Sequence, residues 1–409
     1  MIKRNIYKEI EKSVLSRPVT LITGARQVGK STLALMFEPK GFNYVSLDSS
    51  RERELARKDP EMFLSLHPWP LIIDEVQRAP QLFEAIEEIV NKEKRNNINN
   101  YGMFILTGSQ MYKLMNSVTE SLAGRVSIIH MMPLSRNEII ERDEDVFKFD
   151  IKHINERAAK NPLPPKDLYE IIIKGFYPEL YSNEMLKVQK FYSDYVETYI
   201  ERDVSEMINI KDKFAFRNFM ELLGSLTGEE LIYDNIAKII GVDKKTIMGW
   251  LSVLIAGDIV YLLQPYNELS ISKRIVKRPK IYFNDTGLAC YLAKISSGEI
   301  LSASPYLGRF VETYIINEMK KSFVNNGEEP NFYYYRDNNM NEIDLIIIKD
   351  GKLHRIECKS GISFNNKAVK GFKQLENTDY LIGAKAIICN TPTVYPLDED
   401  VYALPLAGI

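Results

Sequence analysis

The chain has 409 residues, of which 45% are hydrophobic and 11% aromatic. At about 150 residues per domain, this length predicts two to four globular domains with cores of their own. The formal net charge of −2 excludes a strong overall attraction to polyanions, so any nucleic-acid surface must be a local basic patch.

The cysteines Cys290, Cys358 and Cys389 lie far apart, and their number is odd. This usage favours reduced thiols over a disulfide framework, so we expect a cytoplasmic protein. The four histidines are equally scattered and show no zinc spacing. The N-terminus is charged and amphipathic, unlike a signal peptide, and no apolar run approaches the roughly 18 residues of a membrane span, so we expect no membrane partner.

The first distinctive motif lies in the segment LITGARQVGKSTL. A strand over Val19–Thr23 is followed by the spacing G-x-x-x-x-G-K-S and then by a helix, which matches the Walker A pattern. Its glycines let backbone N–H groups point inward, and the helix start adds a positive dipole end, so the loop should bind phosphate. We expect Lys30 to contact the β- and γ-phosphates and Ser31 to ligate Mg²⁺. The predicted nucleotide-binding residues are Gly24, Ala25, Arg26, Gln27, Val28, Gly29, Lys30, Ser31 and Thr32.

Short apolar runs alternate with helical stretches through the N-terminal third of the chain. This alternation predicts an α/β fold in which helices cover both faces of a parallel sheet. The five expected strands are Val19–Thr23, Tyr44–Leu47, Leu71–Ile73, Met103–Leu106 and Val126–Met131.

The third of these runs, PLIIDEVQ, ends in Asp74 and Glu75. A hydrophobic strand with two terminal acids matches the Walker B pattern, although by itself it is a common strand end. We expect Asp74 to hold Mg²⁺ through water and Glu75 to polarise the attacking water.

Other polar residues are candidates for phosphate contacts. Ser109, at the end of the fourth strand, is our first choice to sense the γ-phosphate and Gln110 the second, although Ser109 also suits a helix N-cap. Arg125 precedes the fifth strand and could reach a phosphate in its own subunit or, in a homo-oligomer, a neighbour's; a surface ion pair is the alternative. Arg26 has the same alternatives. Asp48 either supports the metal site or caps a turn.

The segments GARQVGKS, PLIIDEVQ, FILTGSQ and SLAGRV, in this order, resemble the prokaryotic AAA-type ATPases fused to a C-terminal domain of unknown function. The later segments GFYPEL, YVETYIERDV, IYFNDTGLACYL and LGRFVETYIINEM resemble the C-terminal part of the same family. The resemblance implies a P-loop ATPase core that uses ATP and Mg²⁺. Two positions depart from the family's pattern: Ser31 stands where threonine is usual, and Phe176 where a second glycine is common.

The middle of the chain is predicted to be helical. The proline-rich segment KNPLPPKD, residues 160–167, reads as a linker. A helix over Lys187–Ile208 carries an aromatic stripe, which we assign to packing rather than to a binding platform. We expect four parts: an ATPase core over 1–135, a helical region over 136–208, a winged-helix-like domain over 209–290 and an α/β domain over 291–409.

A winged helix is predicted from helices over Asp234–Ile240 and Lys244–Ala256, followed by strands over Ile259–Gln264 and Lys280–Phe283. The segment between the strands is basic. Such a hairpin can bind DNA phosphates, whereas protein docking is the alternative because few polar residues on the second helix suit base recognition. The cations in question are Lys244, Lys245, Lys273, Arg274, Lys277, Arg278 and Lys280.

The last hundred residues contain a second group of candidate site residues. Glu312 lies on a predicted helix, Asp344 on one strand, and Glu357 and Lys359 on one face of the next strand. This order resembles the restriction-endonuclease-like nucleases, in which an Asp and a Glu hold a divalent metal and a lysine stabilises phosphodiester charge. Gln374 and Tyr380 extend the resemblance.

Together these features predict a Mg²⁺-dependent ATPase with catalytic residues Glu75, Lys30, Arg125 and Ser109, whose nucleotide state is coupled to the C-terminal parts. Two alternatives remain open. One is an ATP-gated, metal-dependent DNA endonuclease, and the other is a non-hydrolysing switch or scaffold that binds a protein partner.

Overall fold

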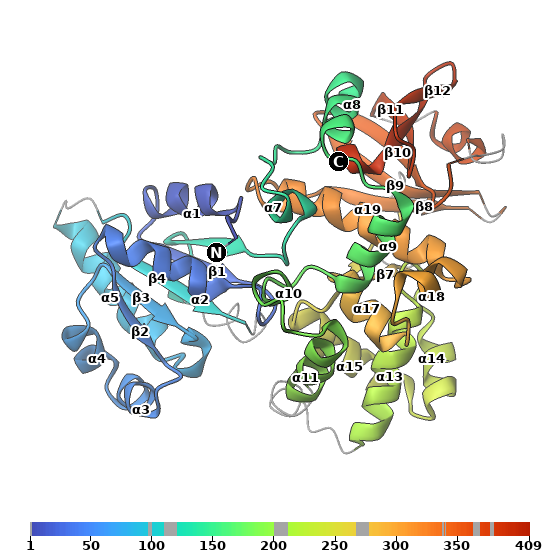
Figure 1. Cartoon of the computed structure of the whole chain (residues 1–409). Coiled ribbons are helices and arrows are strands. Elements are labelled where there is room, and N and C mark those ends of the chain that lie inside the picture. The colour runs from blue at the N-terminus through green and yellow to red at the C-terminus, as the bar shows by residue number, and fades with distance from the viewer. Residues whose placement is uncertain are drawn as a thin grey trace.

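The computed structural model describes residues 2–96, 100–109, 121–199, 212–266, 278–337, 339, 341–362, 369–376 and 380–409, without the side chains of residues 199, 370 and 374. Gln110 and most of the basic segment between the strands predicted over 259–264 and 280–283 therefore lie outside the described residues. The described chain forms three units around a five-stranded, a two-stranded and a six-stranded sheet (Figure 1).

The N-terminal unit is built on the predicted parallel sheet, whose strand order is β2-β3-β4-β1-β5. One face packs Ile22, Ile72 and Ile105 against α1 and α2, and the other packs Leu21, Ile73 and Leu106 against α4 and α5. All five predicted strands are confirmed to within two residues. The strands are β1 (Val19–Thr23), β2 (Asn43–Ser46), β3 (Leu71–Asp74), β4 (Phe104–Gly108) and β5 (Val126–His130), and the helices are α1 (Tyr7–Val14), α2 (Lys30–Ala34), η1 (Leu35–Lys40), α3 (Ser50–Lys58), α4 (Pro60–Leu66), η2 (Val76–Arg78) and α5 (Leu82–Arg95).

The middle unit is mainly helical and contains the predicted pair α14 and α15, followed by the antiparallel strands β6 and β7. In α15 the residues Ile247, Trp250, Leu251 and Leu254 are buried, as their helical spacing predicts. The elements are α9 (Pro165–Lys174), α10 (Glu179–Ser182), α11 (Val188–Tyr199), α13 (Lys213–Ser225), α14 (Tyr233–Ile240), α15 (Lys244–Ala256), β6 (Val260–Leu263), β7 (Lys280–Phe283), α17 (Thr286–Leu292) and α18 (Gly298–Ala303).

The C-terminal unit is a mixed sheet of order β12-β13-β11-β10-β9-β8. Strands β8, β9 and β10 form an antiparallel meander, and β10, β11 and β13 are parallel. Between the N-terminal and middle units, the chain forms two further helices, α7 (Arg136–Ile139) and α8 (Ile151–Lys160). The elements of the C-terminal unit are α19 (Leu307–Val324), β8 (Phe332–Arg336), β9 (Glu342–Lys349), β10 (Lys352–Cys358), η4 (Lys370–Leu375), β11 (Leu381–Cys389), β12 (Tyr395–Asp398), β13 (Val401–Pro405) and η5 (Leu406–Gly408).

Helix α8 lies on the C-terminal sheet although it is far from that sheet in sequence (Figure 1). The side chain of Asn155 accepts a hydrogen bond from the N–H of Val394 at 3.0 Å. Just before α8, the ring of Phe149 stacks on His354 of β10 with a centroid distance of 4.5 Å. Segment 136–160 is therefore part of the packing around the C-terminal sheet as well as a connection.

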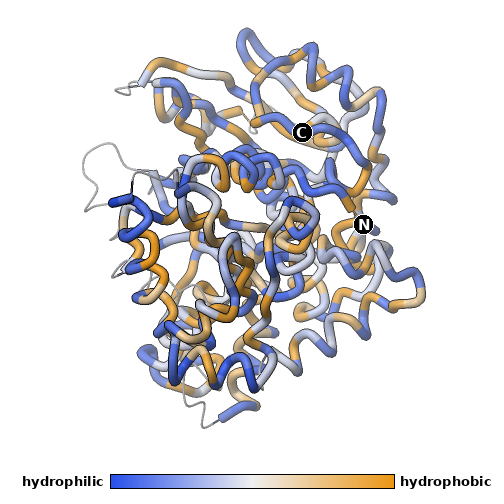
Figure 2. Tube along the Cα trace, turned by 90° about the vertical axis from the view of Figure 1, so that its left-hand side faces the viewer, coloured by the Kyte–Doolittle hydropathy of each residue, from blue (hydrophilic) through white to orange (hydrophobic). Residues whose placement is uncertain are grey.

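One continuous hydrophobic core joins the three units, from Ile6 and Ile22 beside the N-terminal sheet to Leu406 near the end of the chain. Along the helices in Figure 2, hydrophobic and hydrophilic residues alternate, as expected for helices that bury one face. Within the described ranges, no helix combines the length and the apolar character needed to cross a bilayer.

Candidate functional site

The loop between β1 and α2 has the tight geometry that its glycines predict. Gly24 has φ +144°, and a Cβ atom there would lie 2.2 Å from the carbonyl oxygen of Met131. Gly29 has φ +95°, and Gln27, between the two glycines, is also left-handed with φ 62°. This backbone leaves no room for a side chain at Gly24, so the loop requires glycine there.

Lys30 is buried at the start of α2 and folds back onto its own loop. Its ammonium group donates hydrogen bonds to the carbonyl oxygens of Gly24 at 3.0 Å and Ala25 at 2.6 Å. Burial lowers the pKa of Lys30 to about 8, and the neighbouring carboxylates, chiefly Glu75, limit this decrease. A phosphate group in the loop would offer Lys30 anionic oxygens in place of the two carbonyl oxygens.

Ser31 and Asp74 meet across the sheet, as a Walker A and Walker B pair should. The hydroxyl of Ser31 donates to Oδ1 of Asp74 at 2.7 Å, and Thr107 donates to the same oxygen. Tyr44, at the start of β2, donates to Oδ2 of Asp74 at 3.1 Å. Burial, followed by the negative charge of Asp74, raises the pKa of Tyr44 to about 12. The hydroxyl and carboxylate of Ser31 and Asp74 are hard oxygen ligands, a donor set that fits Mg²⁺.

Glu75 adopts a left-handed backbone with φ 58°, and its N–H lies 3.3 Å from the hydroxyl of Thr107. The side-chain amide of Gln77 donates to the carboxylate of Glu75 and lies 3.5 Å from Oγ of Ser109. Ser109 is buried. Gln77 therefore links Glu75 to Ser109, two residues that the sequence singled out, although Gln77 itself was not predicted. The only signal for Gln77 is its place in the same DEVQ segment.

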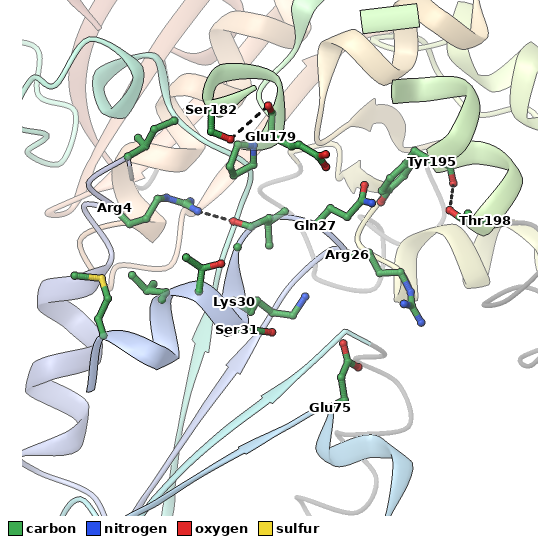
Figure 3. A pocket seen from close by; sticks show the side chains of 17 residues that line it. Arg4, Arg26, Gln27, Lys30, Ser31, Glu75, Glu179, Ser182, Tyr195 and Thr198 are labelled. Atoms are coloured by element: carbon green, nitrogen blue, oxygen red, sulfur yellow. Dashed lines mark hydrogen bonds between the residues drawn. The ribbon is translucent and has the colours of Figure 1, made fainter. Parts of the chain in front are cut away.

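A cavity of about 620 Å³ opens over this loop. It lies between the N-terminal unit and helices α10 and α11 of the middle unit (Figure 3). The middle unit therefore supplies one wall of the cavity, which a sequence motif in the first unit cannot reveal. The lining residues are Ile2, Arg4, Arg26, Gln27, Val28, Gly29, Lys30, Ser31, Thr32, Leu33, Met36, Glu75, Pro178, Glu179, Ser182, Tyr195 and Thr198.

Arg4 is a second residue that sequence reasoning missed. Its guanidinium donates to the carbonyl oxygens of Val28 and Met132, each at 2.7 Å. It also pairs with the carboxylate of Glu138 at 3.0 Å. Arg4 thus fixes the back of the phosphate loop to the segment after β5, a fork geometry that lysine cannot supply.

The other polar candidates occupy different places. Arg125 precedes β5 and lies at the amino edge of the sheet, opposite the loop, where it contacts Glu87 at 3.2 Å and Asn91 at 2.8 Å. The structure does not bring Arg125 to the cavity of its own chain. Arg26 does line the cavity, whereas Asp48 pairs with Arg78 at 2.8 Å.

In the C-terminal unit, the structure brings together all four predicted residues of the second site. Asp344 and Glu357 both contact Lys359, at 3.5 and 2.6 Å. Burial, and then the charge of Asp344, raises the pKa of Glu357 well above its ordinary value. Burial also raises the pKa of Glu312 to about 7, an effect opposed by Lys280. Lys280 was assigned to the basic hairpin, and the structure shows instead that it points into this acidic cluster.

The remaining predicted residues near these sites are described only in part. Tyr380 is half-buried, and Gln374 lies in η4, but its side chain is not described. On α15, Lys244 pairs with Asp234 at 3.0 Å, and Lys245 is exposed. Among the described residues, no group of three or more His, Cys, Asp or Glu side chains has a geometry that could hold a metal ion.

Of the stripe predicted over Lys187–Ile208, the side chains of Tyr192, Tyr195 and Val196 are buried, as packing predicts, although Tyr195 also lines the cavity. The side chain of Tyr199 and residues 200–208 lie outside the described part of the chain. Tyr192 also donates a hydrogen bond to Asp285 at 2.8 Å. The same carboxylate accepts the N–H of Phe176 at 2.6 Å, so the GFYPEL and NDTG segments meet at Asp285. Burial raises the pKa of Asp285. These segments, which the sequence marked only by resemblance, form a buried junction.

Three stretches of the chain match models of known protein families. Residues 16–140 match the family model of an AAA domain. Residues 165–299 and 307–409 match models of two domains of unknown function.

Two relatives span much of the chain. An uncharacterised protein of Mycobacterium tuberculosis is 24% identical over 405 residues, which are 98% of this chain and 83% of the relative. An uncharacterised protein of Methanocaldococcus jannaschii is 25% identical over 313 residues, 69% of this chain and 63% of the relative.

Among solved structures, the Walker-type ATPase of Pyrococcus abyssi has a TM-score of 0.44 at 14% identity, covering 71% of this chain and 96% of that one. The family match and the parallel sheet with its phosphate loop make the N-terminal unit an AAA-type domain with a P-loop α/β fold.

Proposed function

We propose that the chain hydrolyses ATP with Mg²⁺ in the cavity between the N-terminal and middle units. The observation that carries this proposal is the contact of Ser31 with Asp74 at 2.7 Å, with Glu75 lining the same cavity. Two motifs that are far apart in sequence thus present a hydroxyl, a carboxylate and a candidate base around one space.

Each residue has a definite task in this proposal. The N–H groups of residues 24–31 and the ammonium of Lys30 bind the phosphate oxygens and oppose the charge that develops in the transition state. Glu75 orients the attacking water and accepts its proton. In this proposal Ser109, whose Oγ lies 3.5 Å from the amide of Gln77, contacts the γ-phosphate once the substrate is bound. Mg²⁺, held by Ser31 and by Asp74 through water, would neutralise phosphate charge.

The coupling to the other units follows from the walls of the cavity. Helices α10 and α11 provide Glu179, Tyr195 and Thr198 to the side that faces the loop. Closure on ATP would therefore move these helices relative to the sheet, and the shared core would transmit the shift to the C-terminal unit. In this proposal the nucleotide state of the predicted ATPase core, 1–135, is coupled to the other predicted parts, which are 136–208, 209–290 and 291–409.

The test compares ATP turnover and ATP binding in the wild type, Glu75→Gln and Glu179→Gln. Glu179→Gln is the matched control because it removes a carboxylate from the exposed rim of the same cavity. Glu75→Gln should lose about 100-fold or more in turnover while it retains ATP binding. Wild-type-like turnover of Glu75→Gln would refute the role of Glu75, and ATP binding without turnover in the wild type would favour a switch or scaffold.

The proposal does not include nuclease chemistry, although the meander β8-β9-β10 followed by the parallel β11 is compatible with a restriction-endonuclease-like arrangement. Both carboxylates that would hold a metal there contact the ammonium of Lys359. The residues as arranged do not fit a divalent ion. DNA binding by the α14–α15 pair stays a prediction, for which fluorescence anisotropy with duplex DNA, in the presence and absence of ATP, is the direct test.

A further inference from the structure

Lys280 is a buried lysine that connects the middle and C-terminal units. It lies on β7, and its side chain is 4% exposed. Its Nζ is 3.1 Å from Oε1 of Glu312 on α19 and 2.7 Å from Oε1 of Glu342 on β9. It also lies 5.5 Å from the ring centroid of Tyr334 on β8. Three elements of the C-terminal unit therefore surround one cation from the hairpin.

We call Glu312, Glu342, Asp344 and Glu357 the carboxylate cluster. Lys280 contacts the first two, and Lys359 contacts the last two at 3.5 and 2.6 Å. Each carboxylate of the cluster is thus paired with an ammonium group.

Further donors occupy the same oxygens. The hydroxyl of Tyr282 donates to Oε1 of Glu312 at 2.5 Å, the oxygen that also faces Lys280. The N–H of Cys358 donates to Oδ2 of Asp344 at 2.8 Å. A divalent metal would need several of these oxygen lone pairs at once. It would also stand beside two ammonium groups in a largely buried place, where like charges repel strongly.

We propose that Lys280 is a tethered cation that occupies the carboxylate cluster and keeps divalent metal ions out of it. The proposal accounts for the position of a hairpin lysine deep in another unit. It makes the cluster a charged junction between the units and predicts that a metal can bind only where Lys280 is absent.

Binding of Mn²⁺ by the full chain, followed by electron paramagnetic resonance without nucleotide, tests the proposal. Lys280→Met should bind one Mn²⁺ per chain at least about tenfold more tightly than the wild type, and Lys280→Met with Glu312→Gln should lose this gain, because Glu312 is one of the two carboxylates that Lys280 contacts. Lys280→Arg should behave as the wild type. The matched control is Lys321→Met, because Lys321 is a buried lysine paired with Glu318 at 2.8 Å outside the cluster.

Two results would overturn the proposal. One is a folded Lys280→Met protein, as judged by circular dichroism, that gains no Mn²⁺. The other needs no variant: it is an anomalous-scattering peak within ligand distance of Glu312 in wild-type crystals soaked in Mn²⁺. Because this second measurement uses the wild type, it decides the question even if Lys280→Met fails to fold, with a peak refuting the proposal and its absence supporting it.

Discussion

Oδ2 of Asp258 lies 3.1 Å from Nε2 of His130, which joins the turn after α15 to the carboxyl end of β5. His130 is the register partner of Thr23, the residue before the phosphate loop. The amide of Asn284 donates to Oδ1 of Asp258 at 2.9 Å. Although burial raises the pKa of Asp258, His130 and the N–H of Ala25 help to lower it below its ordinary value. The middle unit thus contacts the phosphate loop through one carboxylate.

Asp258→Asn should lower the free energy of unfolding by about 1–3 kcal/mol at pH 7, because it removes a buried charge and leaves its partners less well satisfied. Since the folded-state pKa of Asp258 is depressed, its contribution is present above the ordinary Asp value and is lost as the pH falls through the folded-state value. Urea unfolding at several pH values measures this. Asp234→Asn, which removes an exposed ion pair with Lys244, should change stability by well under about 1 kcal/mol. Equal losses of stability in the two variants would contradict a stabilising role for the buried carboxylate of Asp258.

Gly175→Ala should be strongly destabilising, because a Cβ atom there would lie 2.0 Å from the hydroxyl of Tyr192 and 2.7 Å from Oδ1 of Asp285. Its φ of +72° adds backbone strain, and together we expect a loss of about 2–4 kcal/mol. Gly241→Ala separates the two causes: it has φ +81° but nothing within 4 Å of the Cβ position, so it should cost about 1 kcal/mol. Thermal unfolding of both variants is the measurement, and equal losses would show that strain alone matters at Gly175.

The parts of the site that the sequence predicted are those encoded by local spacing. The loop from Gly24 to Ser31 follows from its own residues, and Asp74 follows from the end of its own strand. Their 2.7 Å contact could also be inferred, because the carboxyl ends of parallel strands meet at one edge of a sheet. The face shared by Glu357 and Lys359 was predictable in the same way, from strand alternation.

Residues such as Arg4, Asp258 and Lys280 could not be assigned from sequence. Each acts on a segment far away in the chain: Arg4 on Val28, Asp258 on His130 and Lys280 on Glu342. Periodicity shows which face of an element is buried but not which element covers it. The amphipathic α8 is an example, because nothing in its pattern indicates the C-terminal sheet. Gln77 was missed for another reason, since a glutamine within one turn of Glu75 has no distinctive spacing.

Gln77→Leu should raise ATP turnover at saturating ATP. In the structure the amide of Gln77 donates to one oxygen of the Glu75 carboxylate, and this bond weakens when Glu75 accepts a proton from water, because a hydrogen bond to an ionised group is stronger than one to a neutral group. A hydrogen bond of about 0.5–1.5 kcal/mol then corresponds to an increase of roughly two- to tenfold. Gln81→Leu, at an exposed position in the same segment, should leave turnover unchanged. A decrease in Gln77→Leu would mean that Gln77 instead positions Glu75 for catalysis.

ATP binding should weaken above pH 8 because of Lys30. Burial lowers the pKa of Lys30 to about 8 in the free protein, and triphosphate charge must raise it, so binding takes up a proton at high pH. Affinity should be nearly flat between about pH 7 and pH 8, where the terminal phosphate of ATP is ionised, and should then fall by up to about tenfold per pH unit. Calorimetry in buffers of different ionisation enthalpy measures both affinity and proton uptake.

Lys30→Arg should bind ATP with little pH dependence, since arginine stays charged. Lys320→Met is the matched control, because burial also lowers the pKa of Lys320 to about 8 but Lys320 does not line the cavity. The variant should therefore keep the wild-type profile. A wild-type affinity that is constant from pH 7 to about pH 9.5 would show that Lys30 keeps its proton throughout and that the phosphate loop does not depress its pKa.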